Sequence, residues 1–181
     1  DLVRGLPDAV GAGALEEAER TDEAVAVLDD AVARVPESPR LHADRAWLLL
    51  RAGQFERVSN LLVPTPDSVK RDPVWLEIAG FAMQGMGETM LAHQCADKAI
   101  ALDPQCARAW VLRGMLAVDD GDDAAAASAF REAIAADPSS AMGHAHLGAL
   151  LWVTGDRTQA CAAIERAFIL DPTHPSILVS Y

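Results

Sequence analysis

Residues 119–123 read DDGDD and gather four carboxylates around one glycine, a composition that resembles a calcium-binding loop. An EF-hand loop also needs oxygen ligands at alternate positions and a closing Glu at its twelfth position, and this segment has neither. A turn followed by a helix accounts for the same residues, because Asp accepts hydrogen bonds from the free amides at a helix start. The sequence therefore predicts a turn here and no metal site.

Two pairs of side chains have the residue types needed for metal binding or nucleophilic chemistry. His144 and His146 are two residues apart, as are His93 and Cys95. Residues that share a helix face are three or four positions apart, so neither pair can act on a common ligand. We interpret the histidines as unpaired surface or packing side chains. The sequence also lacks a glycine-rich phosphate loop and a G-x-S-x-G motif. We therefore expect no catalytic residue and no cofactor.

The composition predicts tightly packed helices. Of the 181 residues, 51% are apolar but only 5% are aromatic, and Ala is abundant. Small side chains let helices approach closely, and the alternating Val, Ile and Thr runs of half-buried strands are missing. A chain with this apolar content can bury a core and does not belong to the disordered class.

The net charge of −12 argues against nucleic acid as a partner, because a chain of this sign repels phosphate. No apolar run is long enough to predict a membrane span. The cysteines have no CxxC spacing, and we read them as small buried side chains in a reducing compartment, which favours the cytoplasm. Since the chain begins with Asp1 rather than Met, we expect it to be part of a longer protein.

The elements that position these side chains recur with a fixed period. The segments AIALDP, AIAADP and AFILDP are 34 residues apart. Their prolines end a helix, because proline lacks the amide that a helix interior requires. Seventeen residues before each proline stands a glycine that permits a left-handed turn between two helices. These positions are Gly87, Gly121 and Gly155. Each period therefore predicts one hairpin of two helices.

Residues that stand at the same position of successive repeats form a column. Two further columns have a structural explanation. Gly80, Gly114 and Gly148 are also 34 residues apart, and they mark points where two helices cross too closely for a larger side chain. Asp122 and Asp156 follow two of the turn glycines and are suitable N-caps for the second helix of each hairpin.

The period divides the chain into five hairpins. In the second hairpin, Pro64 and Pro66 should end the second helix early. The first hairpin is rich in glycine, and we still expect two helices with a turn between them. The units cover about residues 5–38, 39–72, 73–106, 107–140 and 141–174, and residues 175–181 begin a further helix.

These columns resemble the tetratricopeptide repeat family, whose 34-residue unit follows W-x2-L-G-x2-Y, then A-x3-F, A and P. The resemblance is clearest at Trp110, Gly114, Gly121, Ala126, Phe130, Ala133 and Pro138. Arg113 and Ala117 depart from the usual Leu and Tyr, and His144 replaces the Trp of the next unit. The resemblance implies an all-α solenoid of antiparallel helix hairpins that coils into a right-handed superhelix.

The resemblance also implies that the first helices line a concave face, where a partner would bind. We call the row of first-helix residues along this face the strip. Its large apolar side chains are Trp47, Phe81, Met115 and Trp152. Arg40 and Arg108 are candidate polar contacts, or simply solvated side chains. The apolar residues have an alternative interpretation as interhelical core. The Lys/Asn/Arg clamp that some relatives use for a C-terminal carboxylate is missing, since its positions hold Ala43, Glu77, Val111 and Ala145.

The sequence thus predicts a non-catalytic protein–protein interaction module or scaffold that binds a peptide or helix in an apolar groove. Two alternatives remain open: an accessory repeat region of a larger glycosyltransferase- or methyltransferase-type enzyme, and a bacterial chaperone for secretion or envelope assembly. Self-association is a third possibility, because Leu151, Ile177 and Leu178 would leave an apolar C-terminal end.

Overall fold

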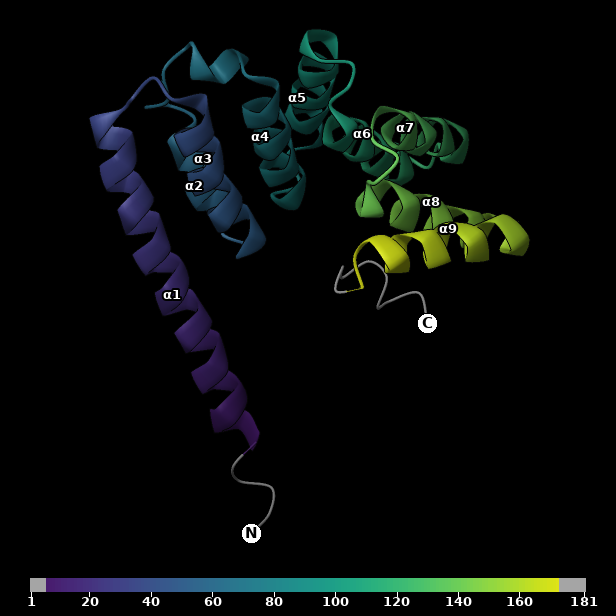
Figure 1. Cartoon of the computed structure of the whole chain (residues 1–181), viewed down its shortest axis with the longest axis horizontal. Coiled ribbons are helices and arrows are strands. Elements are labelled where there is room, and N and C mark those ends of the chain that lie inside the picture. The colour runs from purple at the N-terminus through teal and green to yellow at the C-terminus, as the bar shows by residue number, and fades with distance from the viewer. Residues whose placement is uncertain (1–5, 173–181) are drawn as a thin grey trace. The chain divides into compact units, whose positions relative to one another are not determined.

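The computed structural model describes residues 6–172, with side chains from residue 20 onward, and this part of the chain contains helices but no strand (Figure 1). The expected all-α class is therefore confirmed. The α-helices are α1 (Leu6–Arg34), α2 (Pro39–Arg51), α3 (Phe55–Leu61), α4 (Pro73–Gly85), α5 (Thr89–Leu102), α6 (Ala107–Asp119), α7 (Asp123–Ala136), α8 (Ala141–Thr154) and α9 (Arg157–Leu170), and a 3-10 helix covers Val69–Arg71.

The chain divides into two compact units, residues 1–70 and 71–181, where we had expected one array. The division follows the proline-rich segment after α3. As expected from Pro64 and Pro66, α3 is short and ends at Leu61. The Thr65 hydroxyl donates a hydrogen bond of 2.6 Å to the Leu61 carbonyl, which satisfies one acceptor at this helix end.

The first unit departs from the hairpin that its sequence predicts. Residues 6–34 form one continuous helix, α1, with no turn inside it. The continuous helix is explained by the residue at the turn position. In the other hairpins this position is a glycine, but 34 residues before Gly53 it is Glu19, which favours the helix. Gly11 and Gly13 lie within the helix, where each costs only about 1 kcal/mol relative to Ala. The expected turn between residues 5 and 38 was therefore wrong.

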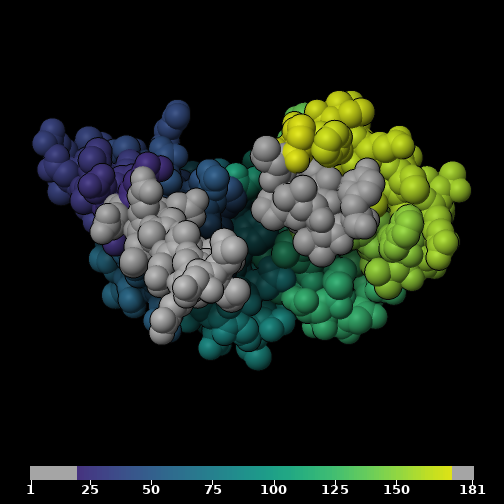
Figure 2. All heavy atoms as spheres, turned by 90° about the horizontal axis from the view of Figure 1, so that it is seen from below, coloured from purple at the N-terminus to yellow at the C-terminus, as the bar shows by residue number. Residues whose placement is uncertain are grey.

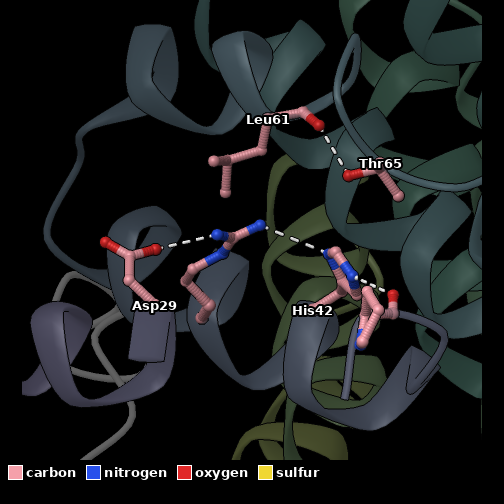
Figure 3. Close-up of polar contacts among 6 residues, drawn as sticks. Asp29, His42, Leu61 and Thr65 are labelled. Carbon is pink, nitrogen blue, oxygen red and sulfur yellow. Dashed lines mark hydrogen bonds and ion pairs between the residues drawn. The ribbon is translucent and has the colours of Figure 1, made fainter. Parts of the chain in front are cut away.

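A series of hydrogen bonds between side chains links α1 to α2 in the first unit (Figure 3). The Arg45 guanidinium donates to Asp29 of α1 at 2.8 Å and lies 3.3 Å from Nδ1 of His42. Nε2 of His42 in turn lies 2.8 Å from the carbonyl oxygen of Pro36 and donates to it. Both Arg45 and His42 are buried, so these bonds replace the water that their polar atoms lose on folding.

Between residues 73 and 170 the second unit contains three helix hairpins in chain order. The helices of each hairpin pack against each other, as α4 with α5, α6 with α7, and α8 with α9, and α6 also contacts α4 and α8 (Figure 1). The turn glycines have the expected left-handed conformation in both units. Their φ angles are 69° at Gly53, 78° at Gly87, 77° at Gly121 and 98° at Gly155.

Close helix crossing explains the other glycine column. A Cβ placed on Gly114 would lie 2.4 Å from Cε1 of the buried Phe130 side chain, and one on Gly148 would lie 2.7 Å from Cγ1 of Ile164. The predicted helix caps are also confirmed. The amide of Ala125 donates to Asp122 at 2.9 Å, and Asp156 accepts the equivalent bond in α9.

A shared hydrogen bond accounts for His144 at the position where the repeat pattern has Trp. Nε1 of Trp110 donates to the carbonyl oxygen of Pro104 at 2.9 Å. Nε2 of His144 lies 3.3 Å from the carbonyl oxygen of Pro138, the same position one repeat later. Trp and His both have a ring N–H group. In each repeat this group can donate a hydrogen bond to the proline carbonyl in the turn before the first helix. The expectation of an unpaired His144 was wrong.

Candidate functional site

The second unit contains a pocket of about 340 Å³, formed by side chains of α4, α6, α7 and α8. Its size is at the lower end of the range for small-molecule sites, and it can hold one or two amino-acid side chains. The apolar lining residues are Met115, Val118, Phe130, Ala149, Leu150 and Val153. The polar lining residues are Gln84, Asp119, Asp123 and His146.

The three first helices of the second unit position most of this lining. Gln84 in α4, Met115 in α6 and Ala149 in α8 belong to the strip next to the crossing glycines, where the sequence places a partner surface. Met115 is half-buried and packs against the core cluster that contains Phe130, while it also lines the pocket. Met115 therefore contacts the core and also lines the pocket, and its contact with a partner stays a prediction.

Helix α8 lines the pocket with Ala149 of the expected strip, but with Val153 in place of Trp152. The pocket-lining residues His146, Ala149 and Val153 are spaced three and four apart and therefore lie on one side of the helix. Val153 is 82% exposed. Trp152 is not among the lining residues. Its indole ring lies 5.4 Å from the guanidinium carbon of Arg157, which gives a cation–π contact at the helix end.

The polar side of the pocket is acidic. Nε2 of Gln84 donates to a carboxylate oxygen of Asp119 at 2.9 Å, which joins α4 to α6. Asp123, the first residue of α7, adds a second carboxylate. No Lys or Arg is among the residues that line this pocket. His146 stacks on Phe130 with ring centroids 5.5 Å apart, so it closes one wall and is not an unpaired histidine.

Arg108, a candidate polar contact, pairs with a buried carboxylate, and 37% of its side chain is exposed. Its Nε lies 2.6 Å from Oε1 of Glu77, a side chain that is only 3% exposed. The thiol of Cys106 donates to the other Glu77 oxygen at 3.1 Å. Burial raises the pKa of Glu77 above its usual value, although Arg108 acts in the opposite direction. Burial and the nearby Glu77 carboxylate raise the pKa of Cys106 to about 12.

The remaining predicted contact residues have varied surroundings. Phe81 in α4 is half-buried and is not among the residues that line the pocket. Trp47 and Arg40 lie in α2 of the first unit, so the pocket is built without them. Trp47 is half-buried, whereas Arg40 is exposed with its Nε 3.7 Å from a carboxylate oxygen of Asp44.

The C-terminal end was a candidate for self-association. Leu151 is buried and does not contribute to an exposed surface. Ile177 and Leu178 lie outside the described residues. On α9, whose yellow atoms form part of the surface in Figure 2, Phe168 is 48% exposed and Ile169 is 69% exposed. Self-association through this end stays a prediction.

The described residues hold no group of three or more potential metal ligands. In the same part of the chain no helix has the length and apolar character needed to cross a membrane. The cysteines differ from the expected buried set, because Cys95 and Cys106 are half-buried but Cys161 is exposed. Cys161 lies in α9, and its side chain is not among the buried residues of that helix.

Comparison with protein families agrees with the hairpin geometry. Two tetratricopeptide repeat models match the chain, one over residues 15–80 and the other over residues 84–141. The chain belongs to the tetratricopeptide repeat family. Members of this family are generally non-catalytic interaction modules. No curated protein sequence matches the chain significantly.

Solved structures share the fold at low sequence identity. The thermophilic repeat protein TTC0263 of Thermus thermophilus is 19% identical with a TM-score of 0.71, over 92% of this chain and 91% of that one. The Cut9 and Hcn1 hetero-tetramer structure gives 14% identity and a TM-score of 0.78, over 90% of this chain and 33% of that one. YrrB, described as having an unusual peptide-binding site, gives 16% identity and a TM-score of 0.57, over 93% and 87%.

The sequence did not identify six of the pocket residues as part of a site. They are Asp119, Asp123, Phe130, His146, Leu150 and Val153. Asp119 and Asp123 stood out only as members of the DDGDD segment, and no local pattern connects that segment to α8. The repeat itself could have indicated these residues. In a repeat array, the end of the first helix in one hairpin lies next to the first helix of the following hairpin.

Proposed function

We propose that this protein is a peptide-binding interaction module and that the pocket of the second unit receives an apolar side chain of its partner. The observation that carries this proposal is the apolar wall that α6 and α8 present at the pocket. Val118 and Val153 are 43% and 82% exposed, although both are hydrophobic and line the same cavity. Burial of such surface by a ligand is favourable by about 25 cal/mol per Å².

The relatives support a peptide as the ligand. The description of YrrB names a peptide-binding site, and a structure of the first repeat domain of Spaghetti contains a bound HSP90 peptide. A pocket of about 340 Å³ suits one or two side chains better than a folded domain. In this proposal the chain has no catalytic role, and the pocket serves equally in a free-standing adaptor, an accessory region of an enzyme or a chaperone.

The proposal includes a surface beyond the pocket. An extended peptide anchored at Met115 continues along the first helices, where Phe81 is half-buried and Trp152 is 47% exposed. Trp47 and Arg40 are separate candidate contacts within the first unit, taken by itself. Arg108 serves as a structural residue in this proposal, because its charge is engaged by Glu77.

Selection of random peptides displayed on phage tests this proposal. Enriched peptides are synthesised with a fluorescent label and titrated by fluorescence polarisation. Val118→Gln combined with Val153→Gln should weaken their binding about tenfold, because partial burial of two Val side chains contributes roughly 1.5 kcal/mol. Met90→Gln combined with Leu102→Gln is the matched control.

The control positions are 75% and 54% exposed and do not line the pocket. The control protein should bind within about twofold of the unchanged chain. Circular dichroism melting verifies that both variants are folded. Equal affinity of the two variants, or failure to enrich any peptide, would show that the pocket is not the binding site.

A further inference from the structure

The carboxylates that line the pocket have no basic partner within the part of the chain that the structure describes. Asp119 accepts a hydrogen bond from Gln84, which is neutral. Asp123 lines the same cavity and takes part in no ion pair among residues 20–172. Neither carboxylate pairs with a Lys or Arg side chain among these residues, in a chain whose net charge is already −12.

The neighbouring acidic residues of the DDGDD segment differ in this respect. Asp120 lies 3.1 Å from Nε2 of His93 on α5. Asp122 accepts the Ala125 amide as the N-cap of α7. Asp120 and Asp122 are not among the residues that line the cavity, whereas Asp119 and Asp123 line it, and Asp119 also joins α4 to α6 through Gln84.

We propose that the partner peptide carries a Lys or Arg next to the apolar side chain that enters the pocket. The inference rests on the proposed function and adds the chemical class of the ligand. A Lys or Arg side chain has an apolar stem and a cationic head, and the cavity has surfaces that suit both. Val118 and Val153 cover an apolar stem, and the carboxylates of Asp119 and Asp123 accept hydrogen bonds from a cationic head.

An acidic ligand is disfavoured by the same arrangement. Gln84 donates one of its amide hydrogens to Asp119 and carries no charge. With two carboxylates and no Lys or Arg among the lining residues, a carboxylate ligand would be repelled. The ligand class is therefore opposite in charge to the C-terminal carboxylate that a Lys/Asn/Arg clamp binds.

The phage-display library of random peptides provides the test, because the charge of the enriched sequences is a readout separate from pocket binding. We expect Lys or Arg within about three positions of a Leu, Ile, Met or Phe. Replacing Asp119→Asn and Asp123→Asn together should weaken the enriched peptides about three- to tenfold, since each exposed ion pair contributes about 0.2–1 kcal/mol. The affinity of the unchanged chain should also fall with added salt, and that of the double variant much less.

The matched control replaces Glu132→Gln and Glu165→Gln, which are exposed residues of α7 and α9 and change the net charge equally. Binding by this control within about twofold of the unchanged chain supports a local effect. Neutral or acidic peptides that still depend on Val118 and Val153 would overturn the charge inference and leave the proposed function intact. Failure of any enriched peptide to depend on those two residues would overturn both.

Discussion

Removal of the Arg108 side chain should destabilise the second unit in a pH-dependent way. The Glu77 carboxylate is almost completely buried, and Arg108 is its cationic partner. For charges about 4 Å apart at an effective dielectric of 20, the attraction is about 4 kcal/mol. Since 37% of the Arg108 side chain is exposed, solvent screens part of this. We expect Arg108→Leu to lower the free energy of unfolding by about 2–3 kcal/mol at pH 7.5.

The pH dependence follows from the direction of the Glu77 pKa shift. Burial raises this pKa in the folded chain, and loss of Arg108 should raise it further because Arg108 lowers it. A raised carboxyl pKa means that the folded state binds the proton more tightly than the unfolded state. Stability is therefore gained as pH falls below the folded pKa and lost as pH rises through it. The cost of Arg108→Leu should therefore be smaller at pH 5.2 than at pH 7.5.

Urea unfolding, followed by circular dichroism and Trp fluorescence at both pH values, measures this cost. Arg131→Leu is the matched control, because Arg131 is an exposed residue of α7 and its loss leaves no buried charge. Replacing Glu77→Leu together with Arg108→Leu should recover most of the lost stability, since no buried charge then remains. The reasoning is refuted if Arg108→Leu costs no more than the control at pH 7.5, or if its cost does not change with pH.

Two further predictions concern the packing and the thiols. Gly114→Ala should lower the free energy of unfolding by about 1–3 kcal/mol, because its Cβ would lie 2.4 Å from the Phe130 ring. Gly121→Ala, where φ is +77° and the space is open, should cost only about 1–2 kcal/mol from backbone strain; chemical unfolding compares the two. Cys161 should react with a thiol reagent at pH 8 before Cys106, whose pKa is about 12, as mass spectrometry of the labelled peptides would show. Equal labelling rates would contradict the proposed burial of the Cys106 thiol.

The sequence by itself determined the local features of this protein. The left-handed turn at Gly121 and the cap at Asp122 depend on a few neighbouring residues, so their types and spacing were sufficient. The crossing at Gly114 was also predictable, because the repeat places the same small residue in successive hairpins. Local rules failed in the first unit, where the position of the turn glycine is Glu19 and α1 continues through it.

The tertiary structure decided what the side chains of the strip do. Arg108 is a candidate ligand contact in the sequence, but the fold places it against Glu77, which lies 31 positions earlier. In α8 the rotation of the helix directs Val153 toward the pocket in place of Trp152, a change of one position along the chain. The position of Asp119 beside an apolar cavity is likewise decided by the tertiary structure. Contacts between successive hairpins depend on how the helices pack, and the residues of any one helix do not specify that packing.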